Sequence, residues 1–412
     1  MKSIFRFLFR IIAGLLLLAA LVITVLSISP VYNFSDPQPF SGPDIYNPYE
    51  GVSGSWKKSC FHTHSKVDNI LNECPEYASK VLEDYMQYGY DIVTFSNHSA
   101  LTPHPTDSTL QVNVYEHGIN IPKFHKLVFN PRKRHLFDHP FPILISQKQW
   151  QLDYLGKDSD FLVLNHPDRT LFNNAKTMRL LTGYRMMEGE CGYDTDLIHW
   201  DEALSAGHYS HNLLSDDCHD SGNHVKIARR CTWLDTPSGR YEDIAPALVA
   251  GRFYSMRIPD FGDGDISAKR KGNASLPSVT GVDVRGDSIF VAFSEPAHIE
   301  AWGQDHKVLN VTDGTAACYV LGENEPYVRF AAGFGNGVRI YTNAFARYDA
   351  SVADSPYVVS PHKVNVLLTI LFNLGLLVIL ILLLVGLKAV LPHKKKETRP
   401  SVEELRFRGI VP

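Results

Sequence analysis

The sequence predicts an α/β fold with a parallel sheet, set between two apolar helices, and three observations point to it. Uncharged apolar runs occupy residues 11–28 and 364–387, near the two ends. Between them, apolar runs of strand length alternate with stretches of helical periodicity, which is the pattern of a parallel sheet. Histidines and carboxylates recur where those strands end, and a parallel barrel carries its active site at that edge.

Both apolar runs are long enough to cross a membrane. They contain 18 and 24 residues, and about 20 apolar residues span a hydrocarbon core about 30 Å thick. Basic residues flank the outer side of each run, with Lys2 and Arg10 before the first and Lys388 after the second. This places both termini in the cytoplasm and the intervening chain outside it, at the plasma or inner membrane. The first run also fits a cleaved signal peptide, because Ser27-Ile28-Ser29 resembles a small-residue cleavage site.

The charge balance of the chain argues against nucleic acid as a partner. Ten of the 40 basic residues but only three of the 44 acidic ones lie outside residues 31–363, which leaves that segment with a net charge of −11. Sequence-independent binding of nucleic acid requires a positively charged surface. We therefore expect no nucleic-acid partner.

Two helices and three strands can be read from periodicity and turn residues. Helical stretches cover residues 75–88, ending at Gly89, and residues 241–250, ending at Gly251. Strand-like runs cover residues 91–95, 161–164 and 211–214. Each strand stops at a short polar segment that contains a histidine: Ser96-Asn97-His98, Asn165-His166-Pro167 and Ser215-Asp216-Asp217-Cys218-His219.

Metal-ligating side chains are expected at these strand ends. His62-Thr63-His64 places two imidazoles on one face of an extended segment, so that both reach the same ion. A lone buried histidine is usually an ordinary core residue, whereas a long ordered series at strand ends is hard to obtain by chance. The series consists of His62, His64, Asp68, His98, Glu116, His125, His166, Asp217 and His219.

These segments resemble the four dispersed motifs of the PHP domain (polymerase and histidinol phosphatase), a family of metal-dependent phosphoesterases. Glu116 and His125 fall where the family has a bridging glutamate and a further ligand histidine. The resemblance covers about residues 56–258 and implies a distorted (β/α)7-type barrel. Two positions depart from the family pattern, Asn97 in place of an aspartate and Asp216 in place of a glycine, and neither removes an expected ligand.

The resemblance also implies two or three divalent ions with shared ligands. Mixed imidazole and carboxylate ligands suit zinc, manganese or iron. The implied sets are His62, His64, Glu116 and Asp217 for the first ion, Glu116, His125 and His166 for the second, and Asp68, His98 and His219 for the third.

The expected activity is hydrolysis of a phosphomonoester or phosphodiester by a metal-bridging hydroxide. Clustered divalent ions lower the pKa of a bound water and neutralise charge on phosphoryl oxygens. We assign the catalytic roles to Glu116 and Asp217, which hold the ions, and to Arg169. The guanidinium of Arg169 either contacts the phosphate or forms an ion pair with Asp168 or another acid.

The expected partners are the bilayer and a phosphorylated small molecule, lipid or glycan. One alternative is a metal-dependent hydrolase of another ester, an amide or a carbamate. Another is a non-catalytic receptor or scaffold that keeps the fold, and its signature would be the loss of several ligands. The complete set of nine argues against that alternative.

The chain is divided as follows in this interpretation: 1–30 an N-terminal anchor or signal peptide, 31–55 a linker, 56–258 the PHP-like hydrolase domain, 259–279 a linker, 280–350 a small antiparallel β-sandwich-like domain, 364–391 a C-terminal transmembrane helix and 392–412 a basic cytoplasmic tail.

Several further side chains near the motifs have open roles. Glu188 and Glu190 either line the pocket or orient ligands, and a nearby histidine is a possible proton donor to the leaving group: His117, His208 or His211. The six cysteines permit disulfides outside the cytoplasm, although their pairing cannot be deduced.

Overall fold

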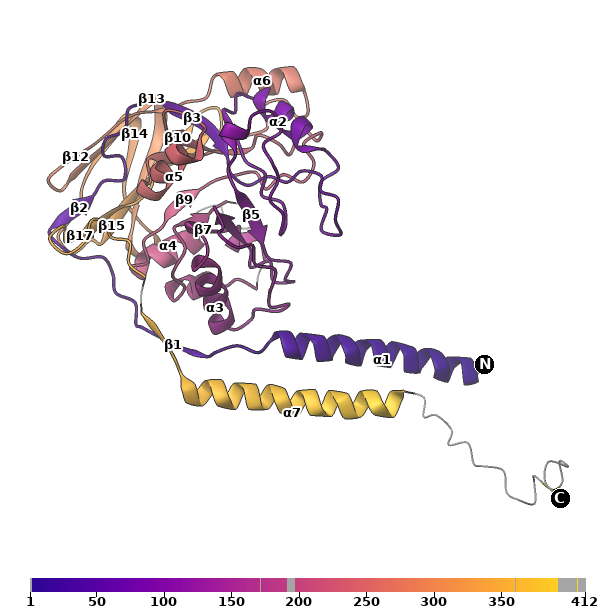
Figure 1. The fold of residues 1–412 in the computed structure, drawn as a ribbon. Coiled ribbons are helices and arrows are strands. Elements are labelled where there is room, and N and C mark those ends of the chain that lie inside the picture. Colours follow the sequence, from indigo (N-terminus) through magenta and orange to yellow (C-terminus); the bar gives the residue numbers. More distant parts are fainter. Residues whose placement is uncertain (1, 171, 191–196, 360, 392–405, 407–412) are drawn as a thin grey trace. The chain divides into compact units, whose positions relative to one another are not determined.

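The structure of the protein is a computed structural model that describes residues 2–170, 172–190, 197–359, 361–391 and 406. The chain forms two units (Figure 1). The helical unit comprises Met1–Ile28 and Ile370–Pro412, and the central unit comprises Ser29–Thr369. The basic tail expected at residues 392–412 lies outside the described residues apart from Arg406, and so does Cys191.

Two helices have the length and hydropathy of membrane spans. They are α1 (Lys2–Leu26) and α7 (Val366–Val390). Their apolar stretches, Ile4–Leu26 and Val366–Val390, have mean hydropathies of 2.6 and 3.0. A 25-residue helix is about 37 Å long at 1.5 Å per residue, which exceeds a hydrocarbon core of about 30 Å. The expectation of two apolar helices is therefore confirmed, while their orientation across a membrane stays a prediction.

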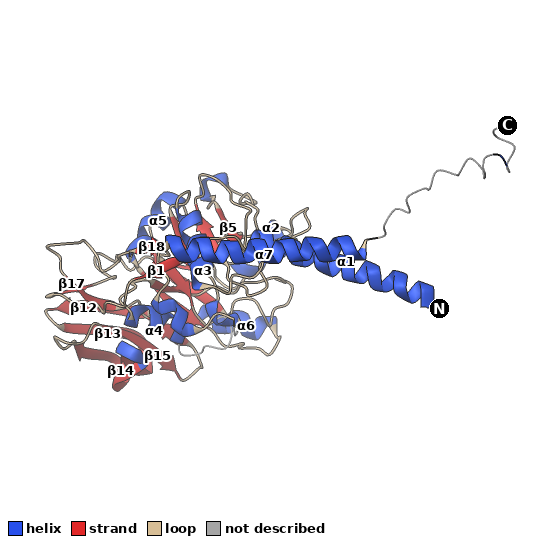
Figure 2. Ribbon diagram, turned by 90° about the horizontal axis from the view of Figure 1, so that it is seen from below, coloured by secondary structure: helices blue, strands red, loops and turns tan. Residues whose placement is uncertain are grey.

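The largest sheet of the central unit has 11 strands and is mostly antiparallel. Among its strands in the described residues, the pair β3–β4 alone is parallel. Figure 2 shows its long strands β12 to β15 in red. Its members are β2 (Asp44–Tyr46), β3 (Trp56–Cys60), β4 (Ile92–Val93), β10 (Arg230–Asp235), β11 (Phe253–Arg257), β12 (Val279–Arg285), β13 (Ser288–Gly303), β14 (Lys307–Val320), β15 (Tyr327–Phe334), β16 (Arg339–Tyr341) and β17 (Phe345–Tyr348).

A second sheet of five strands is mixed. Its strands are β5 (Val114–His117), β6 (Lys126–Phe129), β7 (Phe161–Leu164), β8 (Met186–Glu188) and β9 (His211–Leu213). Strands β7, β8 and β9 are parallel, as predicted, whereas β5, β6 and β7 pair antiparallel. The link from β5 to β6 is only residues 118–125, too short for the crossover of a dozen or more residues that parallel neighbours need. A separate ribbon pairs β1 (Tyr32–Phe34) with β18 (His362–Val364).

Five α-helices accompany the sheets in the described part of the central unit. Two of them, α2 and α5, confirm the predicted helices. Each is followed by a glycine in the left-handed region, Gly89 (φ 77°) after α2 and Gly251 (φ 79°) directly after α5, and such a glycine is a common end of a helix. The helices are α2 (Ala78–Met86), α3 (Ile145–Gly156), α4 (Ile198–Ser205), α5 (Tyr241–Ala250) and α6 (Ile266–Ala274).

Two isolated parallel bridges connect the ends of strands from the two sheets. Thr63 pairs with Cys218, and His98 pairs with Glu116. The amide of His64 donates to the carbonyl of Cys218 at 2.9 Å, and the amide of Asp217 donates to the carbonyl of His62 at 3.0 Å. These bridges bring the histidine-bearing strand ends together, but no closed barrel is found in the described part of the chain, so the expected (β/α)7-type barrel is not confirmed.

The strands of residues 280–350 are antiparallel, as expected, and they continue the large sheet. β16 pairs with β11, and β11 pairs with β10, which in turn pairs with β3. Side chains from this region, such as Phe330 and Phe345, lie in the same buried cluster as Tyr85 and Val93. The division into a hydrolase domain and a separate β domain stays a prediction.

Candidate metal centre

Three groups of histidine and carboxylate side chains meet where strands of the two sheets end. Within each group the potential ligand atoms lie within 4.8 Å of one another. Strand β3 leads into His62 and His64, β4 into His98, β7 into His166 and β9 into Asp217, whereas Glu116 lies within β5. The groups are His62, His64, Glu116 and Asp217; His98, Glu116 and His125; and His64, Glu73, His98 and His219.

The first group is the set expected for the first ion. The Nε2 atom of His62 lies 3.3 Å from Oε2 of Glu116 and 3.1 Å from Oδ1 of Asp217. The Nε2 atom of His64 lies 3.2 Å from each of the same two oxygens. Two imidazoles and two carboxylates thus face one point, and all four side chains are buried.

Glu188 orients His62. Its carboxylate oxygens lie 3.1 and 3.2 Å from Nδ1 of His62, which donates to them. Burial by itself would lower the pKa of His62, but the carboxylates of Glu188 and Glu116 raise it to about 10. Because Nδ1 donates to Glu188, Nε2 is the nitrogen that faces the first group, and a bound metal ion would take the place of its proton. A carboxylate behind a histidine is the usual way to fix the tautomer of a metal ligand.

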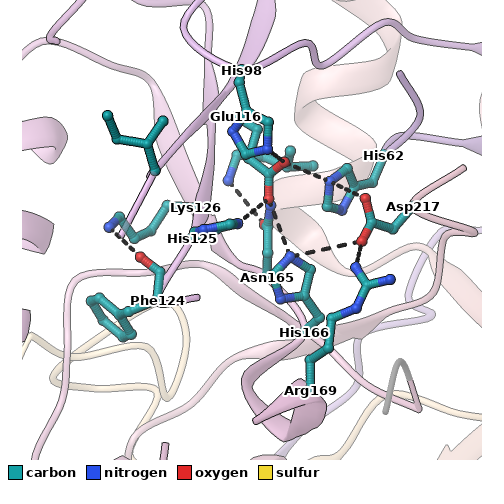
Figure 3. Close-up of polar contacts among 12 residues, drawn as sticks. His62, His98, Glu116, Phe124, His125, Lys126, Asn165, His166, Arg169 and Asp217 are labelled. Atoms are coloured by element: carbon teal, nitrogen blue, oxygen red, sulfur yellow. Dashed lines mark hydrogen bonds and ion pairs between the residues drawn. The ribbon is translucent and has the colours of Figure 1, made fainter. Parts of the chain in front are cut away.

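Glu116 lies between two sets of imidazoles (Figure 3). Its Oε2 atom faces His62, His64 and His98 at 3.2–3.3 Å. Its Oε1 atom lies 3.1 Å from Nδ1 of His125 and 3.2 Å from Nε2 of His166. Burial raises the pKa of Glu116, yet the surrounding imidazoles hold it well below its usual range. A carboxylate shared in this way can bridge two cations.

The third group differs from the expected one. Asp68 is exposed and belongs to none of the three groups. Glu73 lies there instead, with Oε2 at 3.2 Å from Nε2 of His98 and at 2.9 Å from Nε2 of His219. Hydrogen bonding to His219 and His98 lowers the pKa of Glu73. No pattern in the sequence marks Glu73, because it follows His64 in a loop and belongs to no motif.

The donor set fits divalent cations. The Nε2 atom of His62 is buried and makes no hydrogen bond within the described residues. It nevertheless lies close to two carboxylates that share one small volume. Imidazole nitrogens and carboxylate oxygens together suit zinc, manganese or iron. The geometry supports divalent metal binding, while the identity and number of the ions stay predictions, as do the ligand roles of the individual residues.

Arg169 reaches the centre from the turn that follows β7. Its guanidinium contacts the carboxylate of Asp217 (Figure 3). Of the two roles expected for Arg169, the structure therefore has the ion pair with an acidic residue, and that residue is Asp217. Arg169 and Lys123 also line a small cavity of about 70 Å³ whose other walls are metal-group side chains and His166. Both cations are therefore placed beside the cluster.

The other histidines considered as proton donors are turned to backbone carbonyls. His117 bonds with Phe137 at 2.9 Å, His208 with Arg179 at 2.8 Å and His211 with Val249 at 3.2 Å. None belongs to a metal group. Burial lowers the pKa of both His117 and His211 to about 3, so both rings are neutral near neutral pH and keep the single N–H that each donates to its carbonyl.

Glu190 and the cysteines are structural in this arrangement. Glu190 contacts the hydroxyl of Tyr341 and lies 3.5 Å from the Nε atom of Arg257. Glu190 is not part of any of the three groups, unlike Glu188, which orients a member. The five cysteines within the described residues are free thiols, and Cys318 is the exposed one among them.

Comparisons with known proteins give a weak likeness of fold. No family model and no curated protein matches the chain. A solved structure of a two-domain protein from Bacteroides vulgatus ATCC 8482, described as containing a predicted PHP-like metal-dependent phosphoesterase, is similar with a TM-score of 0.35 and 14% identity. The match covers 76% of this chain and 100% of that one. A likeness of this size is not evidence of a shared activity.

Proposed function

We propose that the protein is a membrane-anchored, metal-dependent phosphoesterase of the PHP type. The observation that carries the proposal is the convergence of histidines and carboxylates from separate strand ends on one buried centre, around the shared carboxylate of Glu116. Divalent ions, when bound there, supply an activated water and neutralise charge on a phosphoryl group. His62, His64, Glu116 and Asp217 would hold one ion, with Glu188 keeping His62 in the required tautomer.

The cations at the edge of the centre favour a phosphoryl substrate over other esters or amides. Arg169 and Lys123 line the small cavity together with the metal groups. A guanidinium presents donors in a planar fork that matches phosphate oxygens. The ion pair of Arg169 with Asp217 holds the guanidinium beside the cluster, where it would meet the oxygens of a bound phosphate. An uncharged ester or amide offers no negative charge with which these two cations could pair.

We further propose the finer features of the fold and its setting. The two bridges, Thr63 with Cys218 and His98 with Glu116, would join the strand ends as in a distorted barrel. The central unit would lie outside the cytoplasm, held by α1 and α7, with both termini in the cytoplasm. The substrate would be a phosphorylated small molecule, lipid or glycan, and the acidic central segment argues against nucleic acid.

The proposal is tested with the purified full chain in detergent. Its metal content is measured, and hydrolysis is assayed on panels of chromogenic phosphomonoesters and phosphodiesters, with non-phosphate esters and amides in parallel. We expect turnover of phosphate esters that a chelator abolishes and added zinc or manganese restores. His64→Ala and Asp217→Ala should lose both metal and activity, whereas His298→Ala is the control, because His298 is exposed and outside the metal groups.

The other outcomes separate the alternatives. Turnover of an ester or amide panel without turnover of phosphate esters would favour the second hydrolase class. Bound metal without turnover of any panel member would favour a scaffold or receptor. A wild-type chain that binds no divalent metal would contradict the proposal.

A further inference from the structure

A larger pocket of about 810 Å³ opens beside the candidate metal centre. It shares five lining residues with the small cavity, namely Glu73, Lys123, Arg169, Asp217 and His219. A molecule that filled the pocket would therefore reach the metal groups at one side. The remaining lining includes several cations that the metal centre does not use, among them Lys226, Arg229 and Arg257.

Of these three side chains, here called the distal cations, Arg257 is paired with Glu190, whereas the carboxylates that line the pocket pair with none of them within the described residues. Two carboxylates line the pocket outside the shared residues, Asp216 and Asp220. Asp216 accepts the backbone amides of residues 228–230 at 2.6–2.9 Å, and Asp220 accepts the amide of Asn223. Neither forms an ion pair with a distal cation within the described residues.

Arg229 is held in place without losing its charge. Its Nε atom donates to the carbonyl of Ile258 at 3.0 Å, and Nη1 donates to the carbonyl of Val225 at 3.2 Å. Both acceptors are neutral, and a guanidinium has five N–H donors, so several remain for a ligand. The backbone of Arg229 is bonded to Asp216, the neighbour of the metal-group residue Asp217. This short link fixes the spacing between Arg229 and the metal centre.

Arg257 completes the distal end. Its side chain is 41% exposed, and its Nε atom lies 3.5 Å from the carboxylate of Glu190. Glu190 in turn contacts the hydroxyl of Tyr341. The guanidinium is thus oriented by a carboxylate behind it while a large part of its surface stays accessible. Arg229 and Arg257 are both preorganised, which reduces the entropy that binding an anion would cost.

We propose that the distal cations bind a second phosphate of the substrate, so that the preferred substrates carry one phosphate at the metal centre and another in this pocket. The proposal rests on the proposed function, because it names the substrate class of the same site. Its physical basis is charge: one scissile phosphate is served by the metals with Arg169 and Lys123, which leaves the distal cations for a separate anion. Such a substrate is either a soluble bisphosphate or a membrane lipid that bears a diester and a terminal phosphate.

The test compares matched substrates that differ by one phosphate. The soluble pair is a hexose monophosphate and the matching hexose bisphosphate. The lipid pair, in phosphatidylcholine vesicles, is phosphatidylglycerol and phosphatidylglycerol phosphate. We expect the wild-type chain to prefer the member with two phosphates by about tenfold or more in kcat/KM, mainly through KM, since a charge-assisted contact is worth at least a factor of ten. The pair with the larger preference identifies the source of the substrate.

Two variants locate the effect. Arg229→Gln and Arg257→Gln should reduce kcat/KM about tenfold more for the substrate with two phosphates than for its partner. Arg270→Gln is the matched control, since Arg270 is an exposed arginine that bonds Gln87 outside the pocket, and it should leave both substrates unchanged. Equal losses on both members of a pair, or no preference in the wild-type chain, would overturn the inference.

A binding measurement separates this inference from the proposed function. Isothermal titration of the chelator-treated full chain with inorganic phosphate needs no turnover, and we expect binding that weakens at least tenfold in Arg229→Gln and is kept in Arg270→Gln. Phosphate binding of this kind without hydrolysis of any ester would count against the phosphoesterase and in favour of the distal site. Hydrolysis without any loss of phosphate binding in Arg229→Gln would count against the distal site alone.

Discussion

Buried charge governs the behaviour of individual side chains in this protein. Glu116 and Glu188 are almost fully buried, and each is held ionised by imidazoles that face it. Imidazoles and ionised carboxylates buried a few ångströms apart make a site for a cation rather than a stable apolar core. Whether a residue contributes to metal binding therefore depends on whether its side chain faces the metal groups, and not on how near it lies to a motif in the sequence.

Asp68 and Glu73 provide a direct test of this point. We expect Glu73→Gln to lower the metal content of the purified chain or its affinity for zinc or manganese, because Glu73 faces His98 and His219. Asp68→Asn should leave both unchanged, since its side chain is exposed and belongs to no metal group. Metal analysis and titration check the pair, and the reverse result would favour Asp68 over Glu73 as a metal ligand.

The buried side chain of Lys58 should make the free energy of unfolding depend on pH. Its Nζ atom donates to the carbonyl of Tyr88 at 2.9 Å and to Asn273 at 2.7 Å, and burial lowers its pKa from 10.5 to about 8. Between about pH 8 and 10.5 the unfolded chain binds more protons at this position than the folded chain. The free energy of unfolding contributed by Lys58 therefore rises with pH across this window, by up to about 3 kcal/mol.

The measurement compares the wild-type chain with Lys58→Met by denaturant unfolding at several pH values from about 7 to 10. All five tryptophans lie in the central unit, so their fluorescence reports on that unit. The wild-type chain should gain stability relative to Lys58→Met as pH rises. Lys57→Met, at the half-buried neighbouring position, is the control. A difference that stays constant over the whole range would contradict the assigned cause.

Secondary-structure elements are held together by a few buried polar contacts, of which the pair between β15 and α4 is the clearest. Asp201 of α4 accepts a hydrogen bond from the hydroxyl of Tyr327 at 2.7 Å and lies 3.4 Å from the guanidinium of Arg329. All three side chains are buried. The strand is thereby tied to the helix that lies between β8 and β9 of the five-stranded sheet in sequence.

Removal of Arg329 should be costly. Arg329→Met leaves the carboxylate of Asp201 buried without its guanidinium partner, so we expect a loss of about 3 kcal/mol or more in the free energy of unfolding. Arg339→Met removes an arginine from a partly exposed pair with Glu300, for which we expect less than about 1 kcal/mol. Tryptophan fluorescence in denaturant measures both. Equal losses in the two variants would refute the distinction between buried and exposed pairs.

The whole molecule combines a central unit that carries the metal groups with two helices that have the properties of membrane spans. Both ends of the central unit lead into these helices, so any orientation across a membrane places the metal centre on one side of it. The flanking basic residues predict that this side is extracytoplasmic. An exposed thiol on the central unit makes the orientation measurable.

Cys318 is that thiol. The other cysteines in the described residues are buried, and Cys191 is removed by Cys191→Ser so that it cannot interfere. A membrane-impermeant maleimide should label Cys318 in intact spheroplasts without permeabilisation, and Cys318→Ser should abolish the labelling. Labelling that requires permeabilisation would place the central unit in the cytoplasm and reverse the predicted topology.

Local sequence was sufficient for those features that depend on neighbours along the chain. The apolar helices, the helices that end at Gly89 and Gly251, and the short polar segments after β4, β7 and β9 all follow from hydropathy, periodicity and turn residues. The pairing of His62 with His64 follows from the alternation of an extended chain. Most of the expected ligands therefore meet in the structure.

Contacts between segments that are distant in sequence could be identified only from the tertiary structure. The proximity of Glu73 to His98 and His219 depends on the path of a loop, and loop paths follow from packing that no local pattern records. The link of β16 to β11 and the amide of Asn212 that donates to Asn343 likewise join segments that are far apart in sequence. Periodicity reports which face of an element is apolar, whereas the burial of charge at the metal centre arises only when several elements close around it.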